Sequence, residues 1–148
     1  MVKVAAVLFD LDGVLVDSGE AWYRVMSRGA ARWGRPAITR EAFLATFGQG
    51  VEADRRQFYP HQSTDEITAF YDMAFAEELG TVKRVDGAVE VLADLGGLGL
   101  LRAVVTNTPL HLARRVLAEK GLDRHLEATA AAGEAAEKPA PDLLRLAL

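Results

Sequence analysis

The sequence predicts an α/β protein whose parallel sheet is interrupted by a helical insertion. Residues 4–9 and 100–105 are apolar at nearly every position, which is typical of strands covered on both faces, as in a parallel sheet. Strand and helix patterns alternate in the second half of the chain, and such alternation favours a parallel arrangement. Residues 18–83 contain no convincing strand and are too long for one crossover helix. We therefore interpret them as an inserted all-helical unit.

These boundaries divide the chain into a core and an insertion. We expect residues 1–17 and 84–148 to form the core and residues 18–83 to form the helical insertion. A third candidate strand covers residues 126–131, but its alanines leave the pattern ambiguous between strand and helix.

Two helices are expected in the insertion from local signals. Apolar and small residues recur on one helical face from Trp22 to Trp33, and Gly34 can end that helix. Ser63 and Glu66 have the spacing of a capping box, in which each residue satisfies a backbone N–H of the other. We interpret Trp22 and Trp33 as packing residues rather than binding residues.

Helix starts in the core are predicted from capping residues. Asp86 is expected to cap a helix over residues 87–95. Thr108 is expected to cap a second helix that begins at Pro109, where the missing N–H costs nothing, and that ends before Gly121.

Composition excludes several classes of protein. The chain has 148 residues and a net charge of −4, which argues against a nucleic-acid partner because phosphate neutralisation needs a basic surface. Cysteine is absent from the sequence, so there is no disulfide framework and no thiolate site, as is compatible with a reducing cytoplasm. The apolar start closes at Asp10 and is too short to span a membrane. We expect a cytoplasmic protein without a membrane partner, and the sequence indicates no oligomeric state.

Polar residues follow each of the three expected strands. Asp10 and Asp12 follow the first strand, Thr106 and Asn107 follow the second, and Lys138 lies in the loop after the third. Open parallel sheets place their ligand sites at the carboxyl ends of the strands. Each residue alone has an ordinary explanation as a turn, cap or surface residue, but their joint order along the chain indicates one site.

The residue types in this set suit phosphoryl chemistry. One carboxylate can attack phosphorus as a nucleophile, and a second can donate a proton to the leaving group. Two carboxylates this close repel each other, so a lysine or a hard divalent cation such as Mg2+ must offset their charge. Thr106 and Asn107 offer donors to phosphoryl oxygens, and Lys138 offers a point positive charge.

Three motifs resemble those of the haloacid dehalogenase-like hydrolase superfamily in its phosphatase form. Residues 8–18 are similar to its first motif, residues 104–108 to its second and residues 138–142 to its third. The insertion over residues 18–83 stands in the place of the family's helical cap. Within this superfamily, the motifs and the position of the insertion are most similar to those of the phosphoglycolate phosphatase-like and beta-phosphoglucomutase-like enzymes. The resemblance implies a Rossmann-like parallel core with an inserted helical cap.

The resemblance also implies a role for each site residue. Asp10 would be the nucleophile and a metal ligand, and Asp12 the general acid and base, with its backbone carbonyl also on Mg2+. Thr106 and the backbone of Asn107 would hold the phosphoryl group, and Lys138 would neutralise charge and orient Asp10. The implied activity is Mg2+-dependent hydrolysis of a small phosphorylated metabolite through an aspartyl-phosphate. The presence of an acidic residue at position 12 disfavours a true dehalogenase. The family pattern of the dehalogenases lacks an acid there, because dehalogenation releases no alkoxide that needs a proton.

A fourth motif of the family, an acidic cluster after a further strand, has no match before Leu148. We expect the chain to be a truncated form of a longer phosphatase, with completion of the sheet by another chain as the alternative. The strand over residues 4–9 would then have an unpaired edge. We expect the 148-residue chain itself to show weak or no activity.

Other functions remain open alternatives. A phosphomutase of the same family would carry the same three motifs. The lack of a match to the fourth motif is also compatible with a catalytically inactive fragment. A phosphoacceptor signalling domain of the receiver kind also combines acidic residues, a threonine and a lysine around Mg2+. A receiver domain has no large helical insertion after its first strand, which disfavours this alternative.

Substrate specificity is expected to reside in the insertion, because the core handles only the phosphoryl group. The loop over residues 47–51 could face the site, with Arg55 and Arg56 nearby. An arginine there would favour an anionic substrate tail, and a solvated helix face is an equally good interpretation of both arginines.

Overall fold

The computed structural model describes residues 4–148 and divides into two compact units. One unit comprises Met1–Asp17 together with Lys83–Leu148, and the other comprises Ser18–Val82. Lys83, expected at the end of the insertion, falls in the first unit, where it pairs with Asp17.

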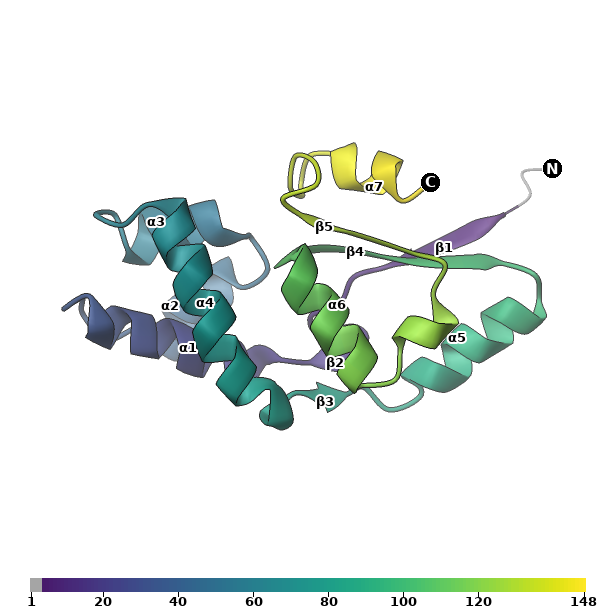
Figure 1. The fold of residues 1–148 in the computed structure, drawn as a ribbon, viewed down its shortest axis with the longest axis horizontal. Coiled ribbons are helices and arrows are strands. Elements are labelled where there is room, and N and C mark those ends of the chain that lie inside the picture. Colours follow the sequence, from purple (N-terminus) through teal and green to yellow (C-terminus); the bar gives the residue numbers. More distant parts are fainter. Residues whose placement is uncertain (1–3) are drawn as a thin grey trace. The chain divides into compact units, whose positions relative to one another are not determined.

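Figure 1 shows the helices and strands of the two units in chain order. The second unit is helical, with α1 (Gly19–Arg32), α2 (Arg40–Thr46), α3 (Val51–Phe58), α4 (Thr64–Glu78) and the 3-10 helix η1 (Leu79–Thr81). The first unit contains β1 (Ala6–Phe9), β2 (Val16–Asp17), β3 (Lys83–Arg84), α5 (Ala88–Gly97), β4 (Leu101–Pro109), α6 (Leu110–Glu119), the 3-10 helix η2 (Asp123–His125), β5 (Ala128–Ala132) and α7 (Asp142–Leu146).

The main sheet of the first unit has the strand order β1–β4–β5, and both pairings are parallel. This confirms the parallel α/β core, and the ambiguous alanine-rich segment is the strand β5. Within the described residues β1 pairs on one side only, with β4. Its residues are half-buried and Val4 beside it is 60% exposed, which agrees with the unpaired edge expected for this strand and not with complete burial. An edge strand lacks one neighbour within the sheet, so that side stays open even where helices cover the faces of the sheet.

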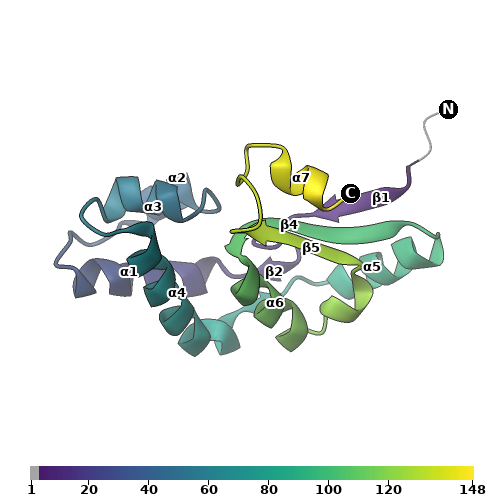
Figure 2. The ribbon, with the colours of Figure 1, turned by 45° about the horizontal axis from the view of Figure 1, so that its top comes forward.

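Helices cover the two faces of this sheet. Figure 2 shows α7 on one face and α5 and α6 on the other. Leu143 of α7 packs with Val105 and Ala130 in a small buried cluster, against which Leu8 of β1 is also packed. The opposite face is closed by an apolar stripe of α6, which comprises Leu112, Ala113, Val116 and Leu117. The sheet is therefore the middle layer of three.

The end of β4 departs from regular pairing. Thr106 lies opposite Ala131 and Pro109 opposite Ala132, so the two intervening residues of β4 have no partner residue in β5. Such a bulge breaks the alternation of side chains and redirects those that it contains.

Two helices of the core begin one residue later than expected. The N-cap of α6 is Pro109, with φ −52° and ψ 139°, and no side chain caps this helix. The expected capping by Thr108 is therefore wrong. The N-cap of α5 is Gly87 rather than Asp86, and its φ of +81° is a left-handed conformation that glycine adopts without a Cβ clash.

Aromatic packing holds the second unit together. The ring centroids of Trp22 and Phe75 are 4.4 Å apart, and those of Trp33 and Tyr59 are 4.8 Å apart. The interpretation of both tryptophans as packing residues is confirmed. The capping box of Ser63 and Glu66 is also confirmed, with both reciprocal bonds formed.

The chain contains no helix, over residues 4–148, with the length and apolar character needed to cross a membrane.

Candidate functional site

The expected site residues all belong to the first unit, at the carboxyl ends of its parallel strands. Asp10 directly follows β1, and Asp12 lies two residues further along. Thr106 and Asn107 are in the last part of β4, and Lys138 is in the loop between β5 and α7. The hydrogen bonds described below bring Asp10, Asn107 and Lys138 into one connected group.

Lys138 and Asp10 form an ion pair at the centre of this group. Nζ of Lys138 lies 2.9 Å from Oδ1 of Asp10 and also donates to the carbonyl oxygen of Val105 at 3.0 Å. The same Oδ1 accepts the N–H of Leu11 at 2.8 Å. Both contacts use Oδ1, which leaves Oδ2 available as a nucleophile. The Asp10 side chain is 43% exposed, so a ligand can reach it.

Asn107 holds the loop that carries Lys138. Its Nδ2 donates to the carbonyl oxygen of Lys138 at 3.0 Å, and its Oδ1 accepts the N–H of Lys138 at 2.8 Å. The side-chain amide is thus engaged by the main chain of Lys138, so the expectation that its donors reach phosphoryl oxygens does not fit the side chain. The backbone of Asn107 remains the group that the family resemblance assigns to phosphate.

Thr106, which precedes Asn107 in the sequence, is almost fully buried, at 1% exposure. Its Oγ1 accepts the N–H of Thr108 at 3.1 Å. A hydroxyl can accept one bond and still donate its own hydrogen. Thr106 can therefore donate to a phosphoryl oxygen while its position is fixed from the other side.

Thr108 is a member of the site that the sequence pattern does not reveal. Its hydroxyl donates to Oδ2 of Asp12 at 2.5 Å, across 96 positions of sequence. A helix cap was the expected role because threonine before proline has that local signature. The contact depends on the bulge in β4, for which the sequence carries no separate signal.

The turn after Asp12 is fixed by backbone bonds. The N–H groups of Leu15 and Val16 both donate to the carbonyl oxygen of Leu11, at 3.0 and 3.1 Å. Gly13 has a φ of +80°, a conformation that a residue with a Cβ adopts only under strain. This tight turn carries the chain from β1 to β2 and keeps Asp12 close to the end of β1.

Asp10 and Asp12 are two of the acidic residues at this edge of the sheet. Residues 4–148 contain no group of three or more His, Asp or Glu side chains arranged to hold a metal ion. Mg2+ is commonly held by one or two carboxylates together with water and substrate phosphate. Asp10 and Asp12 fit that kind of site, with oxygen ligands and an exposed Asp10 carboxylate.

Arg55 and Arg56 are engaged within their own helix, α3. Nε and Nη2 of Arg55 donate to the carboxylate of Glu52 at 2.8 and 2.9 Å, and Nε of Arg56 donates to it at 2.8 Å. The Arg55 bond, then the Arg56 bond, lowers the pKa of Glu52 to about 2. These contacts favour the solvated helix face over a role in holding an anionic substrate tail.

Comparisons with known proteins agree with the fold. The family model of the haloacid dehalogenase-like hydrolases matches residues 7–148. The chain is 34% identical over 148 residues to a plasmid phosphoglycolate phosphatase of Cupriavidus necator, covering 95% of this chain and 64% of the relative. It is 30% identical to the validoxylamine A 7'-phosphate phosphatase of Streptomyces hygroscopicus, covering 96% of this chain and 68% of the relative.

A solved structure gives the same picture. CbbY from Rhodobacter sphaeroides, determined in complex with phosphate, superposes with a TM-score of 0.82 at 26% identity, covering 99% of this chain and 72% of that one. The chain thus spans 64% of the phosphoglycolate phosphatase of Cupriavidus necator and between 44% and 72% of these and other proteins that it matches.

Proposed function

The chain belongs to the haloacid dehalogenase-like hydrolases, and from that premise we propose that the protein hydrolyses the phosphomonoester of a small metabolite. The observation that carries this proposal is the ion pair between Asp10 and Lys138. It places a reactive carboxylate, with one oxygen held and one available, next to a fixed positive charge at the carboxyl edge of the sheet.

The proposed reaction proceeds in two steps. Oδ2 of Asp10 attacks phosphorus, the bond from phosphorus to the ester oxygen breaks, and an aspartyl-phosphate forms. Asp12 gives a proton to the departing oxygen. Water then attacks the phosphorus, Asp12 takes a proton from that water, and Asp10 is released together with inorganic phosphate.

Lys138 and Thr106 have supporting roles in both steps. Lys138 holds Oδ1 of Asp10 and offsets the negative charge that gathers as the phosphoryl group approaches. The Thr106 hydroxyl would donate to a phosphoryl oxygen, and the bond that its oxygen accepts from Thr108 supports this role because it leaves the hydroxyl hydrogen as a donor.

Mg2+ is the cofactor that we propose for this site. The Asp10 carboxylate and the backbone carbonyl of Asp12 would hold it, together with water and the substrate phosphate. When bound, the ion would supply positive charge to the phosphoryl oxygens.

The names of the relatives support a small phosphorylated substrate. They include a phosphoglycolate phosphatase and a validoxylamine A 7'-phosphate phosphatase, and CbbY was also solved with xylulose-(1,5)bisphosphate. We propose that the helical unit Ser18–Val82 selects among such substrates, because the core residues engage only the phosphoryl group.

Turnover of p-nitrophenyl phosphate with Mg2+ by the full-length protein tests the proposed function. Asp10→Asn removes the nucleophile, so we expect turnover to fall at least ~100-fold. Asp94→Asn, an exposed change of the same kind on α5, serves as the matched control and should leave the rate unchanged. Retained turnover in Asp10→Asn would refute the assignment of the nucleophile.

A further inference from the structure

Thr108 has a buried side chain that neither the sheet nor the following helix uses. It is 7% exposed, and α6 begins after Pro109 without any side-chain cap. The hydroxyl instead donates to Oδ2 of Asp12 at 2.5 Å, while the backbone N–H of the same residue donates to Oγ1 of Thr106 at 3.1 Å. One residue therefore ties the carboxyl group after β1 to the hydroxyl at the end of β4.

The bulge in β4 explains why this side chain points at Asp12. Thr106 pairs with Ala131 and the next paired residue is Pro109, so Thr108 is released from the regular ladder. Bulges occur next to functional sites because they re-aim side chains in this way. Asn107, the other released residue, contacts the main chain of Lys138, so both bulged residues hold a charged residue of the site.

We propose that Thr108 is a positioning residue that orients the carboxyl group of Asp12 for proton transfer to the leaving oxygen. This inference rests on the proposed function. The bond from Thr108 restricts the rotation of the Asp12 carboxyl group and so fixes the direction in which that group points. The Asp12 proton can then reach the ester oxygen as the bond from that oxygen to phosphorus breaks, and Asp12 recovers a proton from water in the second step.

The importance of this orientation depends on the leaving group. Phenolate is a strong base and needs a proton as it departs, whereas p-nitrophenolate is a weak base and departs with less help. The ratio kcat/KM reports events up to the first irreversible step, which here is phosphoryl transfer to Asp10. A misplaced Asp12 therefore lowers kcat/KM for phenyl phosphate more than for p-nitrophenyl phosphate.

Two substitutions at Thr108 separate positioning from a structural role. Thr108→Val keeps the shape and removes the hydroxyl, and we expect kcat/KM for phenyl phosphate to fall ~10-fold or more but kcat/KM for p-nitrophenyl phosphate to fall less than ~3-fold. Thr108→Ser restores the hydroxyl and should bring both values back to within ~3-fold of the unsubstituted protein. Equal losses for the two substrates, or no rescue by serine, would overturn the proposal.

A double-mutant cycle tests the contact without relying on activity. Thr108→Val and Asp12→Ala each remove one partner, so the decrease in thermal midpoint of the double variant should be smaller than the sum of the single decreases. Additive decreases would show that the two side chains do not interact, and would overturn the positioning role. Absence of turnover in the unsubstituted full-length protein counts against the proposed function, and the cycle still decides whether Thr108 holds Asp12.

Discussion

The side chain of Asn107 joins two segments of the site that are 31 positions apart in the sequence. Its amide makes two hydrogen bonds with the backbone of Lys138. The ammonium group of that lysine lies against Asp10. Asn107 therefore sets the place of the positive charge, although it does not contact the carboxylate itself.

Replacement of Asn107 by alanine is expected to loosen the Lys138 loop. Both bonds to the backbone of Lys138 are lost, and we expect the free energy of unfolding to fall by about 1–3 kcal/mol because those partly buried groups are left unpaired. Denaturant unfolding measures this change. Turnover of p-nitrophenyl phosphate should also fall, because Lys138 is no longer held in place.

Gln49→Ala is the matched control for this substitution. Its Nε2 also donates to a backbone carbonyl oxygen, that of Ala45 at 2.7 Å, but the bond is exposed. Water replaces such a bond, so the expected change in stability is less than ~0.5 kcal/mol. Equal destabilisation by Asn107→Ala and Gln49→Ala would contradict the role given to Asn107.

The individual residues of the site were predictable to different degrees. Asp10, Asp12 and Lys138 follow strands, and polar residues after apolar runs are visible in the sequence. Asn107 was expected at the site but with a different partner for its side chain, and the contact of Thr108 with Asp12 was not expected. Both differences arise from the bulge in β4, which depends on pairing with β5 and not on local residue type.

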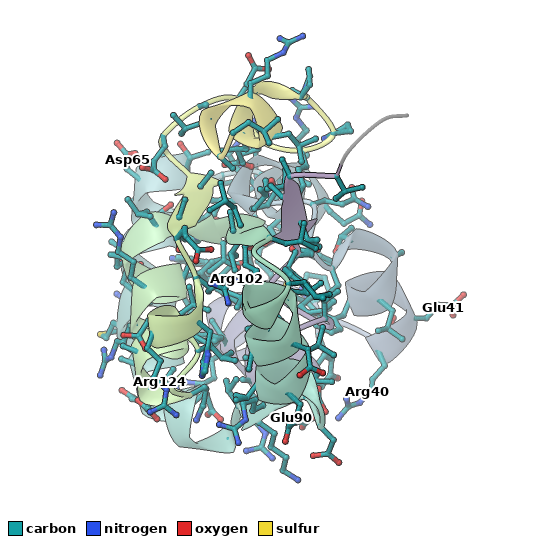
Figure 3. All side chains as sticks on the ribbon, turned by 90° about the vertical axis from the view of Figure 1, so that its right-hand side faces the viewer. Arg40, Glu41, Asp65, Glu90, Arg102 and Arg124 are labelled. Atoms are coloured by element: carbon teal, nitrogen blue, oxygen red, sulfur yellow. The ribbon has the colours of Figure 1, made fainter. Side chains whose placement is uncertain are left out.

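One arginine of β4 is bonded both to α5 and to the segment before β5. Arg102, labelled in Figure 3, donates through Nη1 to the carbonyl oxygen of Leu92 at 2.8 Å and through Nη2 to the carboxylate of Glu127. The bond from the Arg102 side chain, together with that from its backbone N–H, holds the pKa of Glu127 below its usual value. The guanidinium thereby links the helix α5 to the segment before β5.

Two neighbouring glycines of α5 should respond differently to alanine. A Cβ at Gly96 would lie 1.9 Å from Nη1 of Arg102, whereas a Cβ at Gly97 meets nothing within 4 Å. We expect Gly97→Ala to raise the free energy of unfolding by about 0.5–1 kcal/mol through helix propensity and reduced chain entropy.

Gly96→Ala should lack this gain. The added methyl displaces the Arg102 guanidinium from Leu92 and Glu127, and the lost bonds cost about 1–2 kcal/mol, which offsets the gain in propensity. Denaturant unfolding of the two variants side by side measures the difference. Equal stabilisation by both would show that Arg102 moves away freely and does not hold α5 in place.

Elements were predicted better than their ends. The strands β1 and β4, the helical insertion and the capping box at Ser63 follow from apolar periodicity and a local residue pair, whereas β5 was ambiguous and the two-residue strands β2 and β3 were not predicted. The starts of α5 and α6 were each displaced by one residue, because Gly87 and Pro109 provide the N-cap positions in place of the polar residues before them. Backbone conformation at those positions outweighs the capping preference of Asp86 and Thr108.

The whole molecule consists of two units with separate roles in the proposed function. The first unit, Met1–Asp17 with Lys83–Leu148, carries every residue of the candidate site. The chain passes between the units at two places, and the short strands β2 and β3 pair with each other there. Surface residues of the unit Ser18–Val82 can therefore differ without a change in the strand before Asp10 or in the loop that carries Lys138.

The order of the motifs along the chain predicted this architecture because the carboxyl ends of parallel strands lie at one edge of a sheet. The matched family and the relatives confirm the fold class. The unpaired edge of β1 was predicted through the family resemblance, whereas the apolar run alone predicted burial. An apolar run indicates burial, but whether a strand lies at an edge depends on which strands pair with it.

The most direct test of the central claim is to trap a phosphoryl group on Asp10. The full-length protein is mixed with Mg2+ and p-nitrophenyl phosphate and quenched in acid, and intact and peptide masses are measured. We predict the added mass of one phosphoryl group, located on the peptide that contains Asp10, and its absence in Asp10→Asn. A phosphoryl group on another residue, or an unmodified Asp10 peptide in protein that releases p-nitrophenolate in the same mixture, would contradict the account.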